Sequence, residues 1–397
     1  MTNAVLTLNA GSSSLKFALF ELGRDEVHLA ARGQVEGIGA APRLIAKDAK
    51  GGLLAEHRWP DKARLDHEAF LTPLFTFADD HLGGDCLVAI GHRIVHGGVA
   101  FRQPVAIDEG VLERLDALCP LAPLHQPHNL AAVRAARAAR PGLPQVACFD
   151  TAFHHGMAEI VTRFALPRDW HDRGVRRYGF HGLSYEFVSG QLRELDPPLA
   201  AGRALIAHLG NGASLCAIHD GRSVDTTMGF TALDGLMMGT RCGSLDPGVI
   251  LYLQQEAAMT SQAVQTLLYE ESGLLGVSGL SSDMRVLLAS RDPNAKEAVE
   301  LFTFRVAREA GALMTSLGGL DGLVFTAGIG ENAPTIRAAV AQRLGWTGLV
   351  LDVEANARGV GLISAASSRL KAWVVPTDEE VMIARHTADV VGRENAR

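Results

Sequence analysis

The sequence predicts an α/β protein made of two duplicated domains that face each other across an active-site cleft. Short apolar runs typical of strands alternate with Ala- and Leu-rich helical stretches along the whole chain. The segment LTLNAGSSSLKFALFELG at residues 6–23 also returns in weaker form as IAHLGNGASLCAIHDG at residues 206–221. Each copy contains a strand, a small-residue turn and a second strand, with Ser14-Leu15 and Ser214-Leu215 in equivalent places. This similarity indicates an internal repeat.

The expected elements follow from these apolar and helical runs. The clearest strands are Val5–Leu8, Leu15–Phe20, Leu87–Ile90, Val146–Phe149, Ala204–Ala207, Leu215–Ile218, Leu323–Thr326 and Trp373–Val375. The expected helices are 109–118, 128–140, 182–195, 246–258, 294–317 and 378–391. We expect an N-terminal acceptor domain over 1–149, joined by a C-terminal helix at about 378–397, and a nucleotide-binding domain over 150–377.

Composition bounds the class of protein. The 397 residues suffice for two domains with their own cores, and a hydrophobic share of 47% excludes disorder. No apolar run is long enough to cross a bilayer, and the N-terminus lacks the basic segment of a secretory signal.

Charge and cysteine content narrow the partners. The net charge of −7 argues against nonspecific nucleic-acid binding. Five cysteines without a C-x-x-C pair indicate reduced thiols in a cytoplasmic protein. We therefore expect neither nucleic acid nor membrane as a partner.

The first hairpin carries the first functional signal. Asn9, Gly11, Ser12, Ser13, Ser14 and Lys16 stand between two strand-like segments. Small residues let backbone amides and hydroxyls approach a ligand closely, and the lysine suggests an anion. The alternative is an ordinary polar turn. A P-loop does not fit, because Gly11-x-x-x-x-Lys16 lacks the second glycine and the Ser or Thr after the lysine, and leads into a strand.

Two arginines, one in each half, suit a reaction that develops negative charge. Arg93 ends the strand in GHRIVHGG, where its two parallel N–H groups suit a phosphoryl group or a carboxylate. The alternative for Arg93 is a surface arginine paired with some carboxylate. Arg241 lies among glycines in MMGTRCGSLDPG.

Asp150 and His181 each leave a structural alternative open. Asp150 follows a buried strand, at the sheet edge where ligands and metal ions bind, but it could equally cap the next helix. His181 lies in the loop of RRYGFHGLS and is either catalytic or structural.

The last two motifs concern a nucleotide and a metal ion. FTAGIGENAP at 325–334 is a strand, two glycines and a helix start, where backbone amides could approach a nucleotide. In VVPTDEEVMIA at 374–384, Thr377 and Glu380 have the spacing of a capping box. That interpretation leaves Glu379 without a structural task, so Glu379 is the better candidate for magnesium.

Ten motifs in order resemble those of the acetate kinase family. They are NAGSSSLKF, GHRIVHGG, LAPLHQP, FDTAFH, YGFHG, HLGNGAS, MGFTALDGLMMGTRCG, SGLSSDMR, FTAGIGEN and PTDEE, and they span residues 5 to about 386. The resemblance implies the fold shared by acetate and sugar kinases, Hsp70 and actin. It also implies a homodimer that converts ATP and acetate reversibly into ADP and acetyl phosphate, with Mg²⁺ or alternatively Mn²⁺.

The resemblance further implies a role for each matching residue. The catalytic set is Asn9, Arg93, His125, Asp150, His181 and Arg241, with Arg93, Val95, Leu124 and Phe180 binding the acyl substrate and Asn9 and Glu379 binding the metal. Asp150 helps to place that metal. The nucleotide-binding set is Ser14, Lys16, His208, Leu209, Gly210, Asn211, Gly212, Asp283, Met284, Arg285, Gly328, Ile329, Gly330, Glu331 and Asn332.

Three alternative functions remain open, one because the sequence departs from the family pattern and two because other proteins share the fold. Ala232 stands where many family members have a proline beside the acyl pocket, so propionate competes with acetate as the substrate. A non-catalytic nucleotide switch would not need both Arg93 and Arg241. A sugar kinase would use an aspartate such as Asp150 as a base, but the apolar Val95, Leu124 and Phe180 suit a polyol poorly.

Overall fold

The computed structural model describes residues 3–11, 14–24, 26–38, 41–60, 67–82 and 86–395, which form two compact units. Unit 1 consists of Met1–Ala152 together with Asp378–Arg397, and unit 2 is Phe153–Thr377. The first boundary therefore falls after Ala152, so the expected boundary before Asp150 is corrected: Asp150 belongs to unit 1, because its backbone and side chain bond to residues of the same unit. Ser12 and Ser13 lie outside the described residues.

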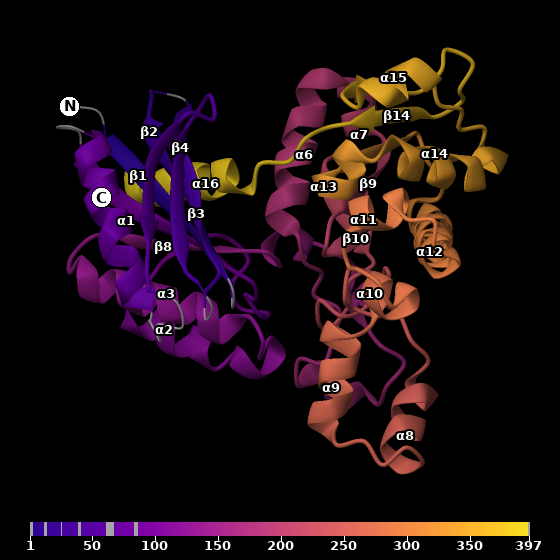
Figure 1. Cartoon of the computed structure of the whole chain (residues 1–397), viewed down its shortest axis with the longest axis horizontal. Helices are drawn as coiled ribbons and strands as arrows, with labels where there is room; N and C mark the ends of the chain where they lie inside the picture. Colours follow the sequence, from indigo (N-terminus) through magenta and orange to yellow (C-terminus); the bar gives the residue numbers. More distant parts are fainter. Residues whose placement is uncertain are drawn as a thin grey trace. The chain divides into compact units, whose positions relative to one another are not determined.

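Unit 1 contains a sheet in the order β5-β4-β3-β2-β1-β6-β8-β7 (Figure 1). Its strands are β1 (Asn3–Ala10), β2 (Leu15–Leu22), β3 (Val27–Glu36), β4 (Arg43–Asp48), β5 (Leu53–Arg58), β6 (Cys86–Ile94), β7 (Val105–Ala106) and β8 (Gln145–Phe149). Its helices are α1 (His67–Leu82), α2 (Glu109–Asp116), α3 (Gln126–Ala139) and α16 (Glu379–Asn395), with 3-10 turns η1 (Cys119–Leu121) and, at the boundary, η2 (Ala152–His154).

Unit 2 contains a second sheet in the order β11-β10-β9-β12-β14-β13. Its strands are β9 (Arg203–Leu209), β10 (Ala213–His219), β11 (Arg222–Thr226), β12 (Gly322–Thr326), β13 (Gly361–Leu362) and β14 (Lys371–Val374). Its helices are α4 (Glu159–Thr162), α5 (Arg168–Asp172), α6 (Gly182–Leu195), α7 (Pro197–Ala201), α8 (Pro247–Gln255), α9 (Ser261–Glu270), α10 (Gly273–Ser278), α11 (Met284–Ala289), α12 (Pro293–Leu317), α13 (Ala327–Asn332), α14 (Pro334–Arg343) and α15 (Val353–Arg358), with the 3-10 turn η3 (Gly345–Thr347).

The two sheets repeat one topology. The run β3-β2-β1-β6-β8-β7 and the run β11-β10-β9-β12-β14-β13 have the same chain order, with two antiparallel pairings, two parallel ones and an antiparallel edge. Unit 1 adds β4 and β5 at its edge. The alternation predicted from the sequence is confirmed, and so is its interpretation as a duplication.

The strand register fixes which residues of the two copies correspond. The last parallel pairs are Ile94↔Phe149 in one sheet and Phe325↔Val374 in the other. In each sheet the register can be followed from this last parallel pair across the neighbouring strand to the hairpin. On that basis the Ala10↔Leu15 pair of the first hairpin corresponds to the Ala207↔Leu215 pair of the second. Leu15 therefore corresponds to Leu215, which confirms the alignment of Ser14-Leu15 with Ser214-Leu215. As predicted, Lys16 begins a strand and not a P-loop helix.

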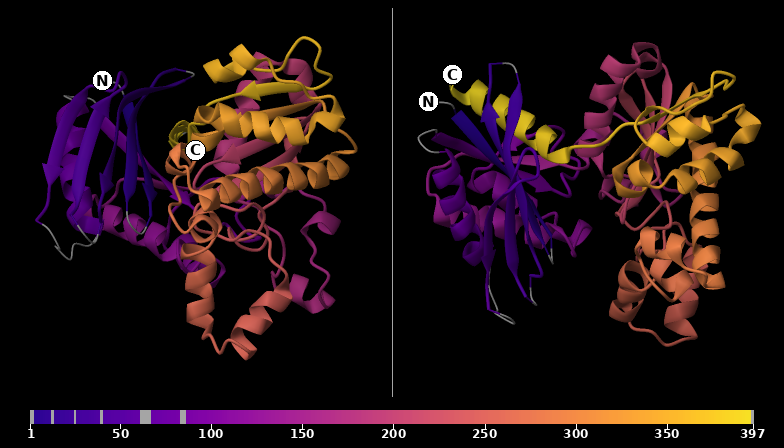
Figure 2. Two further views of the ribbon diagram at one scale, coloured as in Figure 1. Left: turned by 45° about the vertical axis from the view of Figure 1, so that its right-hand side comes forward. Right: turned by 45° about the horizontal axis from the view of Figure 1, so that its top comes forward.

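Each sheet is covered by the helix that follows the other sheet's last strand. α6 comes after β8 in the chain but packs on β9, where Tyr185 and Val188 join a core with Ile206. α16 comes after β14 and packs on β1, β6 and β8, and Figure 2 shows it lying against the indigo strands of unit 1. Gly91 permits this approach, because a Cβ there would lie 2.6 Å from Cγ2 of Ile383.

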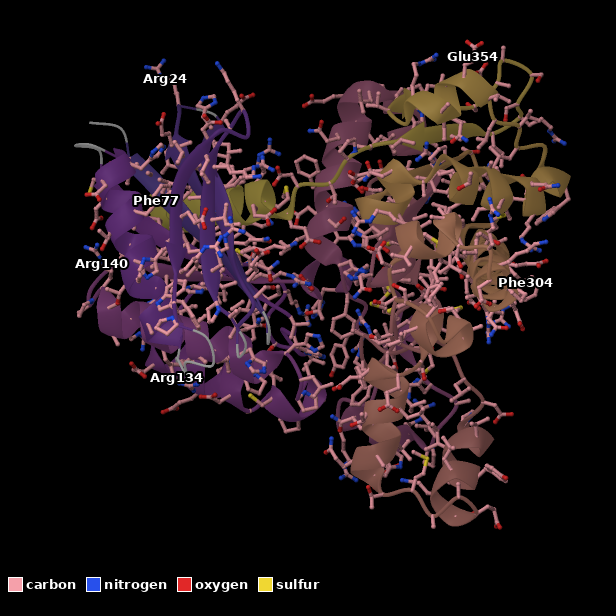
Figure 3. All side chains as sticks on the ribbon, in the orientation of Figure 1. Arg24, Phe77, Arg134, Arg140, Phe304 and Glu354 are labelled. Atoms are coloured by element: carbon pink, nitrogen blue, oxygen red, sulfur yellow. The ribbon has the colours of Figure 1, made fainter. Side chains whose placement is uncertain are left out.

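The opposite face of the unit 1 sheet packs against α1 and α3. Phe70, Leu71 and Leu74 of α1 share a buried core with Leu6 and Leu8 of β1. Charged side chains stay outside, such as Arg134 and Arg140, which pair with Asp116 and Asp79 on the surface (Figure 3). Among the described residues, none of the helices combines the length and apolar character that a bilayer crossing requires.

Candidate active site

In unit 1, polar side chains gather around Arg93 at the carboxyl end of β6. Nε and Nη2 of Arg93 donate to the two carboxylate oxygens of Asp150 at 2.9 and 2.5 Å. Nη1 donates to Oδ1 of Asn9 at 3.1 Å, and Glu379 Oε2 lies 3.8 Å from Nε. Three elements, β1, the end of β8 and the start of α16, thus meet at one guanidinium. We call Asn9, Arg93, Asp150 and Glu379 the Arg93 cluster.

This cluster holds a fixed cation beside two carboxylates. Asp150 is buried, whereas Arg93 and Glu379 keep 23% and 18% of their side chains exposed, so both can meet a ligand. Burial opposes the charge of Arg93, but the charges of Asp150 and Glu379 together raise its pKa above the ordinary value. Arg93 therefore stays ionised and oriented.

Two alternatives from the sequence are settled here. Arg93 does pair with a carboxylate, but at a half-buried strand end and not on the open surface. The carboxylate of Asp150 receives the fork of Arg93, and only the short 3-10 turn η2 follows it, so the ion pair explains Asp150 better than a helix cap does.

Side chains of α3 that the sequence did not single out for this purpose fix the end of β6. Asn129 accepts from the N–H of Val95 at 3.0 Å and donates to the carbonyl of Ala10 at 2.6 Å. Gln126 bonds to both backbone groups of His96. Burial lowers the pKa of His92 and of His96 to about 4, so both imidazoles flanking Arg93 are neutral at pH 7.

The start of α16 corrects one prediction. The capping residue is Asp378, whose Oδ1 accepts from the N–H of Val381 at 3.0 Å. The N–H of Thr377 donates instead to Glu331, and the Thr377 hydroxyl is buried without a hydrogen-bond partner in the described structure. The predicted Thr377–Glu380 capping box is therefore wrong, because the helix begins one residue later than such a box requires.

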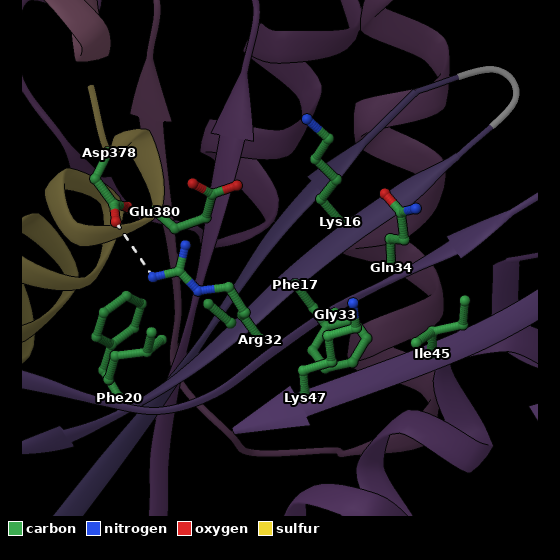
Figure 4. A pocket seen from close by; sticks show the side chains of 12 residues that line it. Lys16, Phe17, Phe20, Arg32, Gly33, Gln34, Ile45, Lys47, Asp378 and Glu380 are labelled. Atoms are coloured by element: carbon green, nitrogen blue, oxygen red, sulfur yellow. Dashed lines mark ion pairs between the residues drawn. The ribbon is translucent and has the colours of Figure 1, made fainter. Parts of the chain in front are cut away.

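Glu380, the residue after Glu379 of the Arg93 cluster, instead lines a cavity of about 270 Å³ (Figure 4). The walls come from β2, β3, β4 and the start of α16, and they include Lys16, Arg32 and Lys47. Arg32 Nη2 lies 3.7 Å from Asp378, as the dashed line in Figure 4 marks. Burial and the neighbouring charge of Glu379 raise the pKa of Glu380. The exposed Lys16 faces this cavity from the strand that continues the first hairpin.

In unit 2, a strained loop presents His181 at the start of α6. His181 has φ 59° and ψ 24°, a left-handed conformation that is unfavourable for a residue with a Cβ and is found at functional sites. His154 supports the loop, because its Nε2 lies 2.9 Å from the carbonyl of Phe180 and its Nδ1 lies 2.8 Å from the Ser223 hydroxyl. Gly179 (φ 78°) allows this contact, since a Cβ there would lie 2.6 Å from the His154 ring.

Two histidines of the predicted site stack on each other. The rings of His181 and His208 lie 4.2 Å apart at 16°. The Ser214 hydroxyl is 2.8 Å from Nδ1 of His181, and the Ser184 hydroxyl is 2.8 Å from Nδ1 of His208. Each ring is thus oriented through Nδ1 by a buried serine.

Arg241 and His181 converge on the glycine turn between β9 and β10. A Cβ added to Gly212 would lie 2.6 Å from Nη2 of Arg241 and 3.3 Å from Nε2 of His181. Arg241 is held by its Nη1, which donates to the carbonyl of Ala232 at 2.5 Å. Asn211 accepts from the N–H of Gly239 at 2.9 Å, so the two loops are joined. The structure therefore brings the predicted residues His181, His208, Asn211, Gly212 and Arg241 together.

Two further groups of predicted nucleotide residues lie on short helices, Asp283 to Arg285 at the start of α11 and Gly328 to Asn332 within α13. Asp283 caps α11 through the N–H of Arg285 at 2.9 Å and also forms an ion pair with its side chain, which is 89% exposed. Asn332 donates to the carbonyl of Gly328 within α13. Glu331 accepts from the N–H groups of Ala327 and Thr377, so its carboxylate has a structural use that the sequence did not suggest.

Some predicted residues contribute no accessible side chain. Leu209 and Met284 are buried in unit 2, so only their backbone could face a ligand. Val95 is nearly buried and Leu124 and His125 half-buried in unit 1, whereas the buried Phe180 belongs to unit 2. Within the described ranges, no group of three or more His, Cys, Asp or Glu side chains is arranged to hold a metal ion. The fit with a divalent cation therefore rests on the oxygen atoms of the Arg93 cluster, which are the donors that magnesium prefers.

The duplicated fold, with fixed arginines and glycine-rich turns, defines a phosphotransferase of the actin-like kinase fold. The chain matches the model of the Acetokinase family over residues 4–385. It is 51% identical to acetate kinase of Rhodopseudomonas palustris, covering 97% of this chain and 98% of that protein, and 50% identical to acetate kinase of Nitrobacter hamburgensis, covering 98% and 96%.

Solved structures agree with the sequence comparisons. A propionate kinase from Francisella tularensis superposes with a TM-score of 0.90 at 36% identity, covering 98% of this chain and all of that one. The acetate kinase of Porphyromonas gingivalis gives a TM-score of 0.86 at 38% identity, with the same coverage. The chain belongs to the acetokinase family, enzymes that transfer a phosphoryl group to a carboxyl group, which confirms the resemblance of the ten motifs. Membership implies ATP as a co-substrate and a divalent metal ion.

Proposed function

We propose that this chain transfers the γ-phosphoryl group of ATP reversibly to acetate, with Mg²⁺ as the metal ion and Mn²⁺ as a substitute. The observation that carries the proposal is the convergence of Arg241 Nη2 and His181 Nε2 at Gly212. A Cβ at Gly212 would collide with Arg241 Nη2, so glycine lets these two nitrogen atoms stand together at the turn, from which both could bind phosphoryl oxygens. The Arg93 cluster supplies a second fixed guanidinium for the carboxylate and the same phosphoryl group.

The residues act by positioning and by charge. The transition state of phosphoryl transfer is loose and carries its charge on the peripheral oxygens, so a catalyst has little covalent work to do. Arg93 and Arg241 bind those oxygens, and His181 donates a hydrogen bond to one of them. No side chain needs to act as a general base, because acetate is already ionised at neutral pH.

The metal ion would be held by Asp150, Asn9 and Glu379, with Glu379 acting through water. When bound, it would neutralise charge on the phosphoryl oxygens. Ser14, Lys16, the turn 208–212, Asp283 to Arg285 and 328–332 bind the nucleotide. His125 lies near the transferring group. We also propose a cytoplasmic homodimer, which rests on the family resemblance and, for the compartment, on five cysteines of which none forms a disulfide.

We propose from the family resemblance that Val95, Leu124 and Phe180 bind the acyl group and favour a methyl group. Ala232 lacks the ring that many relatives place nearby, which leaves slack for one more carbon. One methylene in an apolar pocket is worth about 1–3 kcal/mol, so we expect acetate to be preferred over propionate by roughly tenfold in kcat/KM. Proline at this position would keep the carbonyl that holds Arg241.

The test is detection of acyl phosphate as hydroxamate with ATP, Mg²⁺ and acetate, propionate, butyrate or glycerol. We expect acetate to be best, butyrate poor and glycerol inactive. Ala232→Pro should widen the preference for acetate, and Val95→Ala should narrow it. If propionate is the better substrate of the unmodified enzyme, the propionate alternative replaces acetate. Phosphorylation of glycerol gives a phosphate ester that forms no hydroxamate, so it is followed by ADP release, and its detection would support the sugar-kinase alternative.

A further inference from the structure

The Ser214 hydroxyl lies between His181 and Tyr185, a residue that the proposed reaction does not use. Ser214 Oγ is 2.8 Å from Nδ1 of His181 and 2.5 Å from the hydroxyl of Tyr185. Ser214 and Tyr185 are both fully buried. The three groups form a chain of hydrogen bonds that starts in the core of unit 2 and ends at the imidazole.

The direction of this chain follows from the buried tyrosine. Burial raises the pKa of Tyr185 well above its ordinary value, so its hydroxyl keeps its proton. In the part of the chain that the structure describes, Ser214 Oγ is the hydrogen-bond partner of this hydroxyl. If Tyr185 did not donate to Ser214, a buried O–H would lose its partner, which costs the full desolvation of that group. Tyr185 therefore donates, and Ser214 uses its single proton to donate to Nδ1 of His181.

An imidazole that accepts at Nδ1 carries its proton on Nε2. That nitrogen atom lies against Gly212 together with Nη2 of Arg241. A proton there makes His181 a donor to an anion, whereas the other tautomer would direct a lone pair at the same oxygen and repel it. The hydrogen bonds from Tyr185 through Ser214 thus determine whether His181 can donate to an anion.

The neighbouring His154 shows the same arrangement independently. Its Nε2 lies 2.9 Å from the carbonyl of Phe180, which can only accept, so Nε2 carries the proton. Its Nδ1 then accepts from the Ser223 hydroxyl at 2.8 Å. Burial lowers the pKa of His154 to about 4, so the ring is neutral and this tautomer is the state at pH 7.

We propose that Tyr185 and Ser214 are positioning residues that hold His181 in its Nε2–H tautomer, aimed at the transferring phosphoryl group. The tautomer rests on the geometry alone, and its use in catalysis rests on the proposed function. No proton needs to move along the chain during the reaction. The hydroxyl groups set the ring in advance.

The experiment combines ¹⁵N NMR of the histidine rings with turnover. Long-range ¹H–¹⁵N spectra distinguish a protonated ring nitrogen from an unprotonated one, and His181→Asn identifies the signals of His181 by their loss. We expect a protonated Nε2 in the unmodified protein. Ser214→Ala should give a mixture of tautomers, and kcat with acetate should fall about tenfold while KM for ATP changes little.

Two further variants separate positioning from folding. Ser214→Ala leaves the Tyr185 hydroxyl without a partner, whereas the double variant Tyr185→Phe/Ser214→Ala removes both hydroxyl groups and should be close to neutral in stability. We expect the double variant to unfold at nearly the temperature of the unmodified protein and still show mixed tautomers and reduced kcat. For Tyr185→Phe alone, the share of the other tautomer and the loss of kcat should lie between those of the unmodified protein and of Ser214→Ala. The Ser214 hydroxyl can then donate its proton in either direction.

Four outcomes decide between these possibilities. A protonated Nδ1 in the unmodified protein, or an unchanged tautomer in Ser214→Ala, would overturn the proposal. A changed tautomer with full turnover would overturn the claim that it serves catalysis. An unmodified protein with the Nε2–H tautomer but no acyl phosphate production would refute the proposed function and leave the assignment of the tautomer supported.

Discussion

The two units share a sheet topology but place their proposed functional residues differently. In unit 1 the polar residues Asn9, Lys16 and Arg93 lie within strands, and by the shared register they correspond to Ile206, Cys216 and Val324 of unit 2. These three equivalent residues are fully buried in the core of unit 2. In unit 2 the functional residues lie instead in loops, at His181, Gly212 and Arg241.

The two groups of residues are also held by different forces. The Arg93 cluster is ionic, with a guanidinium between two carboxylates. The residues of unit 2 are held by hydroxyl and carbonyl groups, with Ser214 on His181 and Ala232 on Arg241. A duplicated fold therefore does not imply a duplicated site: the topology supplies equivalent strand ends, and the local sequence decides what chemistry each end supports.

The largest expected effect is the loss of either arginine. Arg93→Ala and Arg241→Ala should each lower kcat roughly a hundred- to a thousandfold, because each removes about 3–4 kcal/mol of charge stabilisation in the transition state. The units should differ in stability, since Arg93→Ala leaves the buried Asp150 without its cation and should lower the melting temperature more than Arg241→Ala does. The measurement is steady-state turnover together with thermal unfolding. Variants that keep more than about a tenth of kcat, with only KM changed, would contradict the assignment.

Acid should destabilise both units through buried neutral histidines. The pKa values of His92, His96 and His154 fall from 6.5 to about 4 in the folded state, so the unfolded chain binds more protons between these pH values. The free energy of unfolding should therefore decrease as the pH falls from about 6.5 to 4, by on the order of 3 kcal/mol for each histidine. Urea unfolding at several pH values in this range measures the free energy of unfolding. Hydrogen exchange should show lower protection of backbone amides at the acid end of the range, both in β6 and in the His154 region. Constant stability over the range would refute the burial of these rings.

A smaller effect separates two adjacent glutamates of α16. Glu379→Gln should weaken the apparent affinity for Mg²⁺ roughly ten- to a hundredfold, because it removes an oxygen that holds the ion through water. Glu380→Gln is the matched control and should keep its activity. A magnesium titration of both variants makes the comparison. If they behave alike, Glu379 is not the metal residue.

Glu380→Gln should also change stability with a defined sign. The folded pKa of Glu380 is raised above its ordinary value of 4.5, so its contribution is fully present below that pH and is lost as the pH rises through the folded pKa. The variant should therefore gain stability relative to the unmodified protein above pH 4.5.

The sequence correctly predicted the strands and helices that have a clear local pattern. The strands around both hairpins and the helix 182–195 appear as expected, because buried strands and amphipathic helices carry their periodicity in the chain. The strands β3, β4 and β5 were missed. The edge strand β5 is exposed along most of its length, and β3 and β4 mix polar with apolar residues, so no long apolar run marks any of them.

The sequence identified the residues of the candidate site but not the contacts between them. The sequence singled out Arg93, Asp150 and Glu379, yet their convergence depends on α16 packing against a strand nearly 300 residues earlier in the chain. The capping box failed because Glu331 accepts from the N–H of Thr377, which Glu380 would need, and because Asp378 caps the helix one residue later through the N–H of Val381. Tyr185 and Ser214 carry no motif signal for their role, which follows only from distances.

The proposed function requires Arg93 of unit 1 and Arg241 of unit 2 to act on one phosphoryl group. The most direct test is a double-mutant cycle of Arg93→Ala and Arg241→Ala, with kcat for hydroxamate-trapped acetyl phosphate as the readout. If both arginines hold one phosphoryl group as a unit, the loss of either misplaces that group for the other. Their effects are then not additive, and the double variant should be about as slow as the slower single variant. A double variant slowed by the product of the two single effects would contradict the claim, because the arginines would then act independently.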